Sequence, residues 1–264
     1  MSTLGLDATL VSPDQDPGRL EREMDRLAEH GIGALEIRLE RPRSVDARRL
    51  RGLADAARFE LSAVCDLPAL FDPQDSADDA LALLEGVFRD CADLNSPVLG
   101  GMLYGVRGNR KAQGQRALDK ATRFLERAAK AALVYDVRLA VEPANRYETR
   151  LFNRAEDAFR AVERIGSENL VIALDTSHMH AEEKSFAAGF ETAAPFLASV
   201  RLAEANRGVP GSGMVDWTAV FASLDTIAFN GSVTLSAEAR LDEVLEEGLP
   251  LLREKAGRFT LGRS

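Results

Sequence analysis

The sequence predicts one (β/α)8 TIM barrel spanning residues 1–264, on three observations. Short apolar runs alternate with amphipathic helical patterns from one end of the chain to the other. No linker rich in Pro, Gly or Ser divides the 264 residues. Eight strand–helix units within this length favour a closed barrel over an open doubly wound sheet, which would carry a glycine fingerprint after its first strand.

Eight apolar runs are the expected strands, and each precedes a helical pattern. They cover residues 3–8, 34–39, 60–65, 97–103, 137–142, 169–174, 198–202 and 231–237. In the first helical pattern, apolar residues recur at helical spacing and predict one buried face, made of Leu20, Met24, Leu27 and Ala28.

Two later segments carry clear helix signals. Residues 113–134 repeat apolar residues at helical spacing. Residues 153–164 begin with Asn153 as the expected N-cap and Glu156 as its capping-box partner, and Gly166 is expected to end that helix.

The composition indicates a globular protein with 45% hydrophobic and 28% charged residues. The formal net charge of −9 argues against nucleic acid or an anionic membrane as a partner. Cys65 and Cys91 form no CxxC pair, which is consistent with a reduced, cytoplasmic compartment. The sequence "MSTLGLDATLV" lacks the pattern of a signal peptide, and no apolar run is long enough to span a bilayer.

Ionisable or polar residues follow nearly every expected strand. In barrels of this type the catalytic residues stand at the carboxyl ends of the strands, so this convergence predicts a functional rim. The rim positions are Asp7, Arg38 with Glu40, Asp66, Tyr104, Glu142, Asp175, Arg201 with Glu204, and Glu238.

Three of these rim residues, Glu142, Asp175 and Glu238, are carboxylates reached directly from apolar strands. Three carboxylates at one mouth repel each other, so a cation or a bound proton is expected among them. Carboxylate oxygens with an imidazole nitrogen, such as that of nearby His178, suit Mg, Mn or Co.

The segments "EPANRYE", "LDTSHMHAEEKSF", "AEANRGVPGSGMVDW" and "LSAEA" resemble successive signatures of the sugar isomerase/epimerase superfamily with xylose-isomerase-like barrels. The ketose 3-epimerases (tagatose/psicose 3-epimerase group) are the nearest match. The resemblance implies a divalent metal ion (Mn, Mg or Co) held by Glu142, Asp175 and Glu238. It also implies that Glu142 and Glu238 move protons on opposite faces of a sugar, and that Glu148, His178 and Arg207 contact the substrate.

One departure from the family pattern falls on the seventh strand. The family reads H-x-H-x-G-E-x-N-R, whereas this chain reads "SVRLAEANR", which places Arg201 at the position of the histidine ligand. A guanidinium has no lone pair for a metal. We therefore expect an altered metal site in which Arg201 pairs with Asp175 and contacts substrate. His180 is expected at the surface, and Arg107 is expected either in a cationic pocket or on a surface loop.

These observations predict an isomerase or epimerase that acts on a ketose or a related hydroxy-ketone through an enediolate. Two alternatives remain open from the sequence. One is a dehydratase or lyase of the same superfamily, and the other is a metal-depleted, non-catalytic sugar-binding barrel. The expected partner is a small-molecule sugar or hydroxy-ketone, and the resemblance implies a homodimer or homotetramer.

Overall fold

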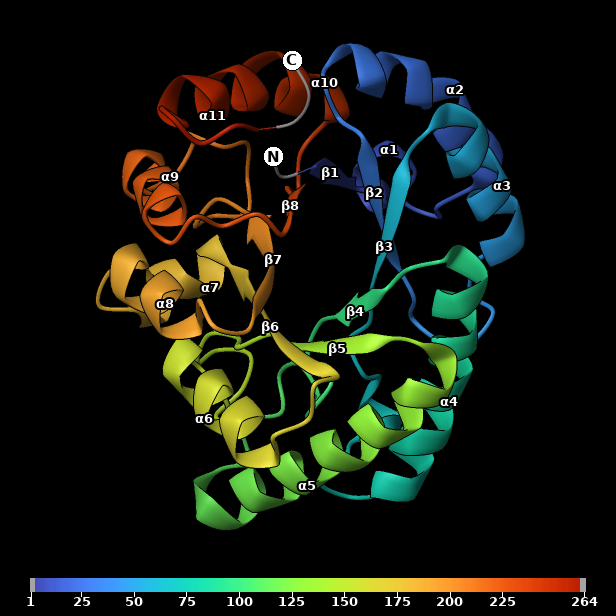
Figure 1. Cartoon of the computed structure of the whole chain (residues 1–264), viewed down its shortest axis with the longest axis vertical. Coiled ribbons are helices and arrows are strands. Elements are labelled where there is room, and N and C mark those ends of the chain that lie inside the picture. Colours follow the sequence, from blue (N-terminus) through green and yellow to red (C-terminus); the bar gives the residue numbers. More distant parts are fainter. Residues whose placement is uncertain (1–2, 262–264) are drawn as a thin grey trace.

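The computed structural model describes residues 3–261, which form a closed parallel barrel with the strands in sequence order (Figure 1). The last strand pairs back with the first. The predicted TIM barrel is therefore confirmed. Its strands are β1 (Leu4–Asp7), β2 (Ala34–Arg38), β3 (Glu60–Val64), β4 (Val98–Gly100), β5 (Arg138–Val141), β6 (Leu170–Asp175), β7 (Leu197–Leu202) and β8 (Ser232–Leu235).

Helices surround the strands and cover the outer face of the barrel (Figure 1). They are α1 (Ala8–Val11), α2 (Pro17–Glu29), α3 (Ala47–Ala57), α4 (Ala77–Leu94), α5 (Gly114–Ala132), α6 (Ala155–Ile165), α7 (Thr176–Glu182), α8 (Phe186–Ala193), α9 (Trp217–Thr226), α10 (Leu241–Glu243) and α11 (Leu249–Lys255). Short 3-10 turns at Ala69–Phe71 and Leu133–Tyr135, and a π-helical turn at Val244–Gly248, complete the elements. Within the described residues, no helix is both long and apolar enough to cross a bilayer.

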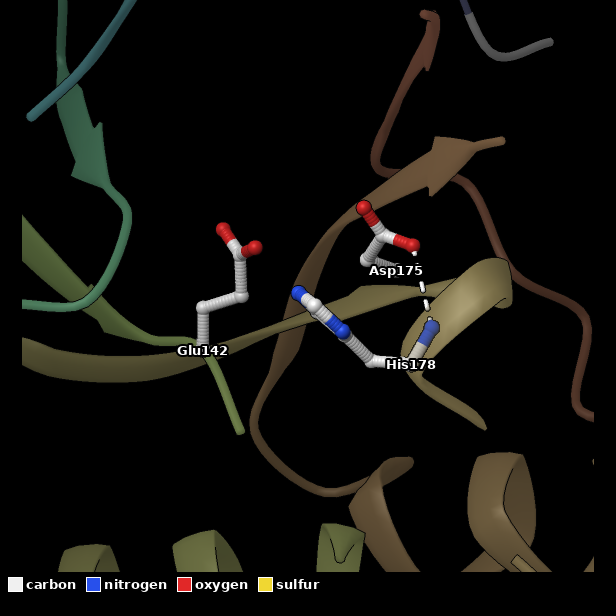
Figure 2. Close-up of side chains that lie close together, drawn as sticks. All are labelled: Glu142, Asp175 and His178. Atoms are coloured by element: carbon white, nitrogen blue, oxygen red, sulfur yellow. Dashed lines mark hydrogen bonds between the residues drawn. The ribbon is translucent and has the colours of Figure 1, made fainter. Parts of the chain in front are cut away.

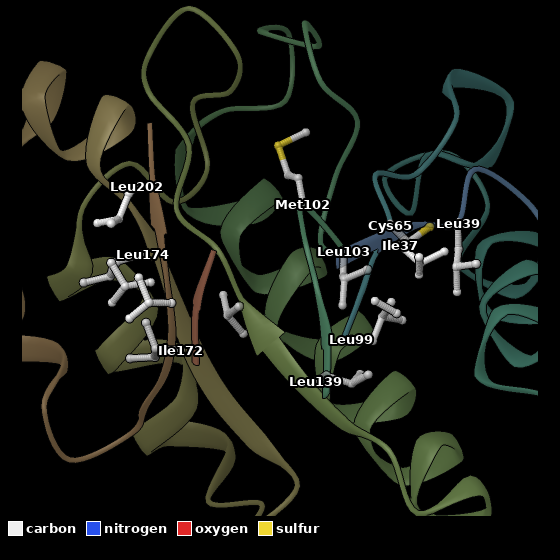
Figure 3. Close-up of a cluster of buried hydrophobic side chains, with 14 of the residues drawn as sticks. Ile37, Leu39, Cys65, Leu99, Met102, Leu103, Leu139, Ile172, Leu174 and Leu202 are labelled. Carbon is white, nitrogen blue, oxygen red and sulfur yellow. The ribbon is translucent and has the colours of Figure 1, made fainter. Parts of the chain in front are cut away.

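The main apolar core lies between the strands and the helices, because alternate strand residues point outward. In β2, Leu35 and Ile37 are fully buried on this outer side. Figure 3 shows part of the same core, including Leu99, Leu139 and Ile172. Burial of this layer is the principal force that holds the helices on the barrel.

The other set of strand residues points into the barrel. A Cβ added to Gly5 would meet Ala34 Cβ at 3.3 Å and Thr234 Oγ1 at 3.4 Å, so small side chains fill this part of the interior. Two residues further along, the same inward positions hold charged groups. Gly5 is in register with Ala34 on β2, and Asp7 is in register with Glu36. A layer of small residues inside the barrel is therefore followed by a layer of charged ones.

Three details differ from the sequence-based expectations. β4 ends at Gly100 rather than at residue 103, because Gly101 adopts φ +104° and lies too close to the Cys65 carbonyl for any side chain. The cap of α6 is shifted: the carboxylate of Asp157, not Glu156, accepts from the backbone N–H groups that precede the helix. Ala28 is exposed rather than on the buried face of α2. Gly166 ends α6 at φ +65°, as predicted.

Candidate active site

Strands β5 and β6 deliver two buried carboxylates to the mouth of the barrel. Glu142 follows β5 directly and is 3% exposed, and Asp175 ends β6 and is 1% exposed. The Tyr104 hydroxyl donates to the Glu142 carbonyl oxygen at 3.0 Å, which fixes the backbone at the first carboxylate. One carboxylate oxygen, Glu142 Oε1, is buried without a hydrogen-bond partner among the described residues.

His178 joins these two carboxylates because Asp175 also caps helix α7. Asp175 Oδ1 accepts from the backbone N–H groups of Ser177 at 2.8 Å and His178 at 3.2 Å. This cap sets the first turn of the helix and turns the imidazole toward Glu142 (Figure 2). Glu142, Asp175 and His178 each offer an atom within 4.8 Å of the others.

Two guanidinium groups contact this cluster. Arg207 NH1 donates to Asp175 Oδ2 at 2.7 Å, and its NH2 lies 3.2 Å from His178 Nε2. Arg107 NH1 lies 3.4 Å from the same ring nitrogen, and its NH2 lies 3.9 Å from Glu142 Oε1. Both arginine side chains are 29% exposed, so they face the mouth as well as the cluster.

Asp66, in the loop after β3, holds Arg107 in place. Its carboxylate accepts from Arg107 Nε at 2.9 Å and NH2 at 3.1 Å, a two-point contact. Met102 N–H and Arg38 also donate to Asp66. Burial opposes ionisation of this carboxyl, but Arg107 and the other donors outweigh it and hold its pKa well below the usual range.

The ion pair expected between Asp175 and Arg201 is not formed, and that prediction was wrong. Although the two residues are in register on β6 and β7, Arg201 NH2 pairs with Glu36 Oε1 at 2.5 Å, and Asp175 pairs with Arg207. Arg201 Nε is buried without a partner among the described residues. Burial raises the pKa of Glu36 to about 7, against the opposing charge of Arg201.

Glu238 does not join the cluster, and the expectation of three converging carboxylates is corrected. β8 ends at Leu235, and Ser236 takes the next inward position, where its hydroxyl donates to Asp7 Oδ2 at 3.1 Å. The chain then leaves the barrel, and Glu238 is exposed. Its backbone N–H donates to the Arg207 carbonyl at 2.6 Å, which keeps it beside the mouth.

The remaining predicted residues occupy the loops around the mouth. Glu148 is half-buried on the loop after β5, and its carbonyl accepts from Gly108 N–H at 2.8 Å. This contact joins the loops after β4 and β5. His180 is exposed on α7, as expected. Glu36 was not predicted as a site residue, although its alternation with Leu35 and Ile37 indicated an inward carboxylate.

The pKa values of Asp175 and His178 are both lowered, for different reasons. Burial opposes ionisation of Asp175, but its interactions with His178, Arg207 and Arg201 hold its pKa well below the usual range. Burial lowers the pKa of His178, and the nearby Asp175 opposes that effect. Asp175 is therefore the ionised partner, and the imidazole is neutral near pH 7.

The described residues do not fit a four-ligand divalent metal site. Glu142 and Asp175 are present, but Arg201 stands at the third implied position and Glu238, the fourth, is exposed. His178 Nε2 faces two guanidinium groups, so its lone pair either accepts from them or is replaced by a proton. Its Nδ1 faces the Asn145 backbone N–H at 3.3 Å and side-chain amide at 3.0 Å. A metal ion bound at His178 Nε2 would have to displace both guanidinium groups from that nitrogen.

The closed parallel barrel and its charged mouth define a TIM-barrel protein whose site lies at the carboxyl ends of the strands. Residues 24–255 match the xylose isomerase-like TIM barrel family, and the chain belongs to this family. An L-ribulose 3-epimerase from Mesorhizobium japonicum is 28% identical over 259 residues, covering 94% of this chain and 85% of the relative.

Two further comparisons agree with this assignment. A D-psicose 3-epimerase from Enterocloster bolteae is 37% identical over 143 residues, covering 52% of this chain and 47% of the relative. The crystal structure of a D-allulose 3-epimerase from Methylomonas sp. in complex with D-allulose superposes with a TM-score of 0.87 at 22% identity. That alignment covers 96% of this chain and 97% of the crystallised one, and it supports the fold.

Proposed function

We propose that this protein is a sugar epimerase of the ketose 3-epimerase type. The family assignment and the relatives named as L-ribulose and D-psicose 3-epimerases support this class. The observation that carries the proposal is Glu142 Oε1, a buried carboxylate oxygen with no hydrogen-bond partner among the described residues. Such an oxygen is available to take a proton from a bound molecule.

In the proposed reaction, Glu142 removes the proton from the carbon next to the ketose carbonyl. The C–H bond breaks, its electron pair moves toward the carbonyl carbon, and negative charge develops on the carbonyl oxygen. Donors that already point into the site can stabilise this oxygen without reorganisation. Arg107 beside Glu142 and Arg207 beside His178 supply such donors.

His178 is the proposed substrate contact. Every described partner of its two ring nitrogens is a donor: Arg107 and Arg207 at Nε2, and Asn145 at Nδ1. Asn145 Oδ1 already accepts from Tyr147 N–H at 3.0 Å, which fixes the orientation of that amide. The neutral ring therefore carries one N–H without an acceptor, and a sugar oxygen in the mouth would supply it.

Inversion at carbon requires a proton on the face opposite Glu142. The two-glutamate hypothesis assigns this proton to Glu238. Its carboxylate is exposed beside Arg207, so the hypothesis requires the segment after Ser236 to turn that side chain inward around the substrate.

Solvent exchange tests the proposed function. D-psicose and L-ribulose are each incubated with the protein in deuterated water, and loss of the C3 proton signal and formation of the epimer are followed by NMR. The wild type should exchange and epimerise at least one of them. The Glu142→Gln variant should do neither, whereas Glu126→Gln, an exposed carboxylate on α5, should behave as the wild type. Exchange by Glu142→Gln at the wild-type rate would remove Glu142 from the mechanism.

A further inference from the structure

We infer that the electrophile of this site is the guanidinium pair of Arg107 and Arg207, and that proton abstraction by Glu142 needs no divalent metal ion. The inference rests on the proposed function, since it names the positive charge that the same reaction uses. Its basis is that the two arginines lie within 4 Å of one potential ligand atom on each of Glu142, Asp175 and His178.

The two arginines contact atoms that a metal ion would need as ligands. Arg207 occupies Asp175 Oδ2, and both arginines converge on His178 Nε2, at 3.2 and 3.4 Å. An imidazole nitrogen has a single lone pair, so it cannot serve a guanidinium and a metal together. A metal ion about 2.1 Å from Nε2 would lie within roughly 5.5 Å of both guanidinium nitrogens, where like charges repel.

Neighbouring residues hold both guanidinium groups in place. Asp66 fixes Arg107 through two hydrogen bonds, and its own position is fixed by Met102 N–H. Arg207 is held through its side chain by Asp175 and through its carbonyl by Glu238 N–H. Pre-positioned donors lose little free energy of reorganisation when an oxyanion forms.

The formal charges around the mouth nearly balance. Five carboxyl groups and four guanidinium groups form ion pairs there, and with every carboxyl counted as ionised they leave one formal negative charge. These groups are Asp7, Glu36, Asp66, Glu142 and Asp175 with Arg38, Arg107, Arg201 and Arg207. Side chains alone thus supply the compensating charge. The balance also favours a neutral sugar over an anionic one.

Manganese titration tests this inference independently of activity. After treatment with a chelator, free Mn²⁺ is measured by electron paramagnetic resonance as the protein is titrated. The wild type should bind Mn²⁺ with a dissociation constant no tighter than about a millimolar. Arg207→Met, which removes the guanidinium from Asp175 and one of the two from His178, should bind at least tenfold more tightly. Arg150→Met is the matched control, because Arg150 is an exposed arginine outside the cluster and should match the wild type.

A second measurement uses only the wild type and therefore does not depend on how the variants fold. Deuterium exchange into D-psicose and L-ribulose should continue at an unchanged rate in excess EDTA. Micromolar or tighter Mn²⁺ binding by the wild type would overturn the inference, as would unchanged Mn²⁺ affinity in folded Arg207→Met. Exchange that stops in EDTA and returns with Mn²⁺ would do the same. Absence of exchange with either sugar under every condition would instead count against the proposed function, while the Mn²⁺ titration would still decide the inference.

Discussion

Replacing Glu204 by Gln should destabilise the protein by about 3 kcal/mol or more, because the carboxylate accepts four hydrogen bonds in full burial. Oε1 accepts from the N–H groups of Ala205 and Val215, each at 2.9 Å. Oε2 accepts from Gly211 N–H at 2.9 Å and Trp217 Nε1 at 3.0 Å. A glutamine NH2 must face two of these four donors in either orientation of the amide. Two hydrogen bonds to a charged group are lost, each worth roughly 1.5–3 kcal/mol.

The assay is urea unfolding followed by circular dichroism at pH 7, with unfolding free energies compared between variants. Glu238→Gln makes the same change on an exposed side chain and should alter stability by less than about 0.5 kcal/mol. A Glu204→Gln loss below about 1 kcal/mol, the value of an ordinary neutral hydrogen bond, would refute this account of the four bonds.

The contribution of the Glu204 carboxylate to the unfolding free energy should depend on pH. Burial opposes its ionisation, but the hydrogen bonds from Val215, Ala205, Gly211 and Trp217 outweigh burial and lower the pKa of Glu204. A lowered folded-state pKa means that the stabilisation is present above the unfolded-state pKa of about 4.3 and is lost as the pH falls further. The stability difference between the wild type and Glu204→Gln should therefore shrink below about pH 4, and a constant difference would contradict the assignment.

Four further predictions concern the site and its supports. Glu142→Gln should lower turnover by on the order of 10²–10⁴, measured by NMR of the epimer, with no change in the circular dichroism spectrum. Glu238→Gln should lose epimerisation but keep deuterium exchange at the carbon that faces Glu142, and wild-type epimerisation would remove Glu238 from the mechanism. Arg207→Ala should raise the Michaelis constant for the sugar more than it lowers the melting temperature, and an unchanged constant would contradict its role as a substrate contact. Gly101→Ala should lower the melting temperature strongly, since the new Cβ would lie 2.2 Å from the Cys65 carbonyl oxygen at φ +104°, and an unchanged melting temperature would contradict that close approach.

The barrel could be predicted from the sequence because its determinants are local and repeated. The expected strand ends put Asp175 and Arg201 at the rim of the barrel, and the structure has them in register on β6 and β7. The same rule failed for Glu238, since it assumes that the strand continues. β8 stops at Leu235, and two residues of irregular chain, Ser236 and Ala237, separate that end from Glu238, whose backbone N–H contacts Arg207.

The partners of the charged residues could not be predicted in the same way. Arg201 and Asp175 are neighbours in register, yet Arg201 reaches Glu36 across the barrel interior. An arginine side chain is long enough to reach several carboxylates. Its partner depends on where those carboxylates lie in three dimensions, which the spacing of residues along a strand does not predict. Arg207 reaches Asp175 from the loop after β7, whose shape depends on the buried contacts of Glu204.

The pairing of β1 with β8 affects how the protein folds during synthesis. Asp7 and Ser236 are joined across a sequence separation of 229 residues, and β1 has its eighth-strand neighbour only once residues 232–235 exist. During synthesis at about 5–20 residues per second, the β1 edge must wait for tens of seconds for its partner. Closure of so long a loop also predicts slow refolding relative to a helical bundle of equal length. A chain stopped before β8 would keep an open sheet edge that can pair with other chains.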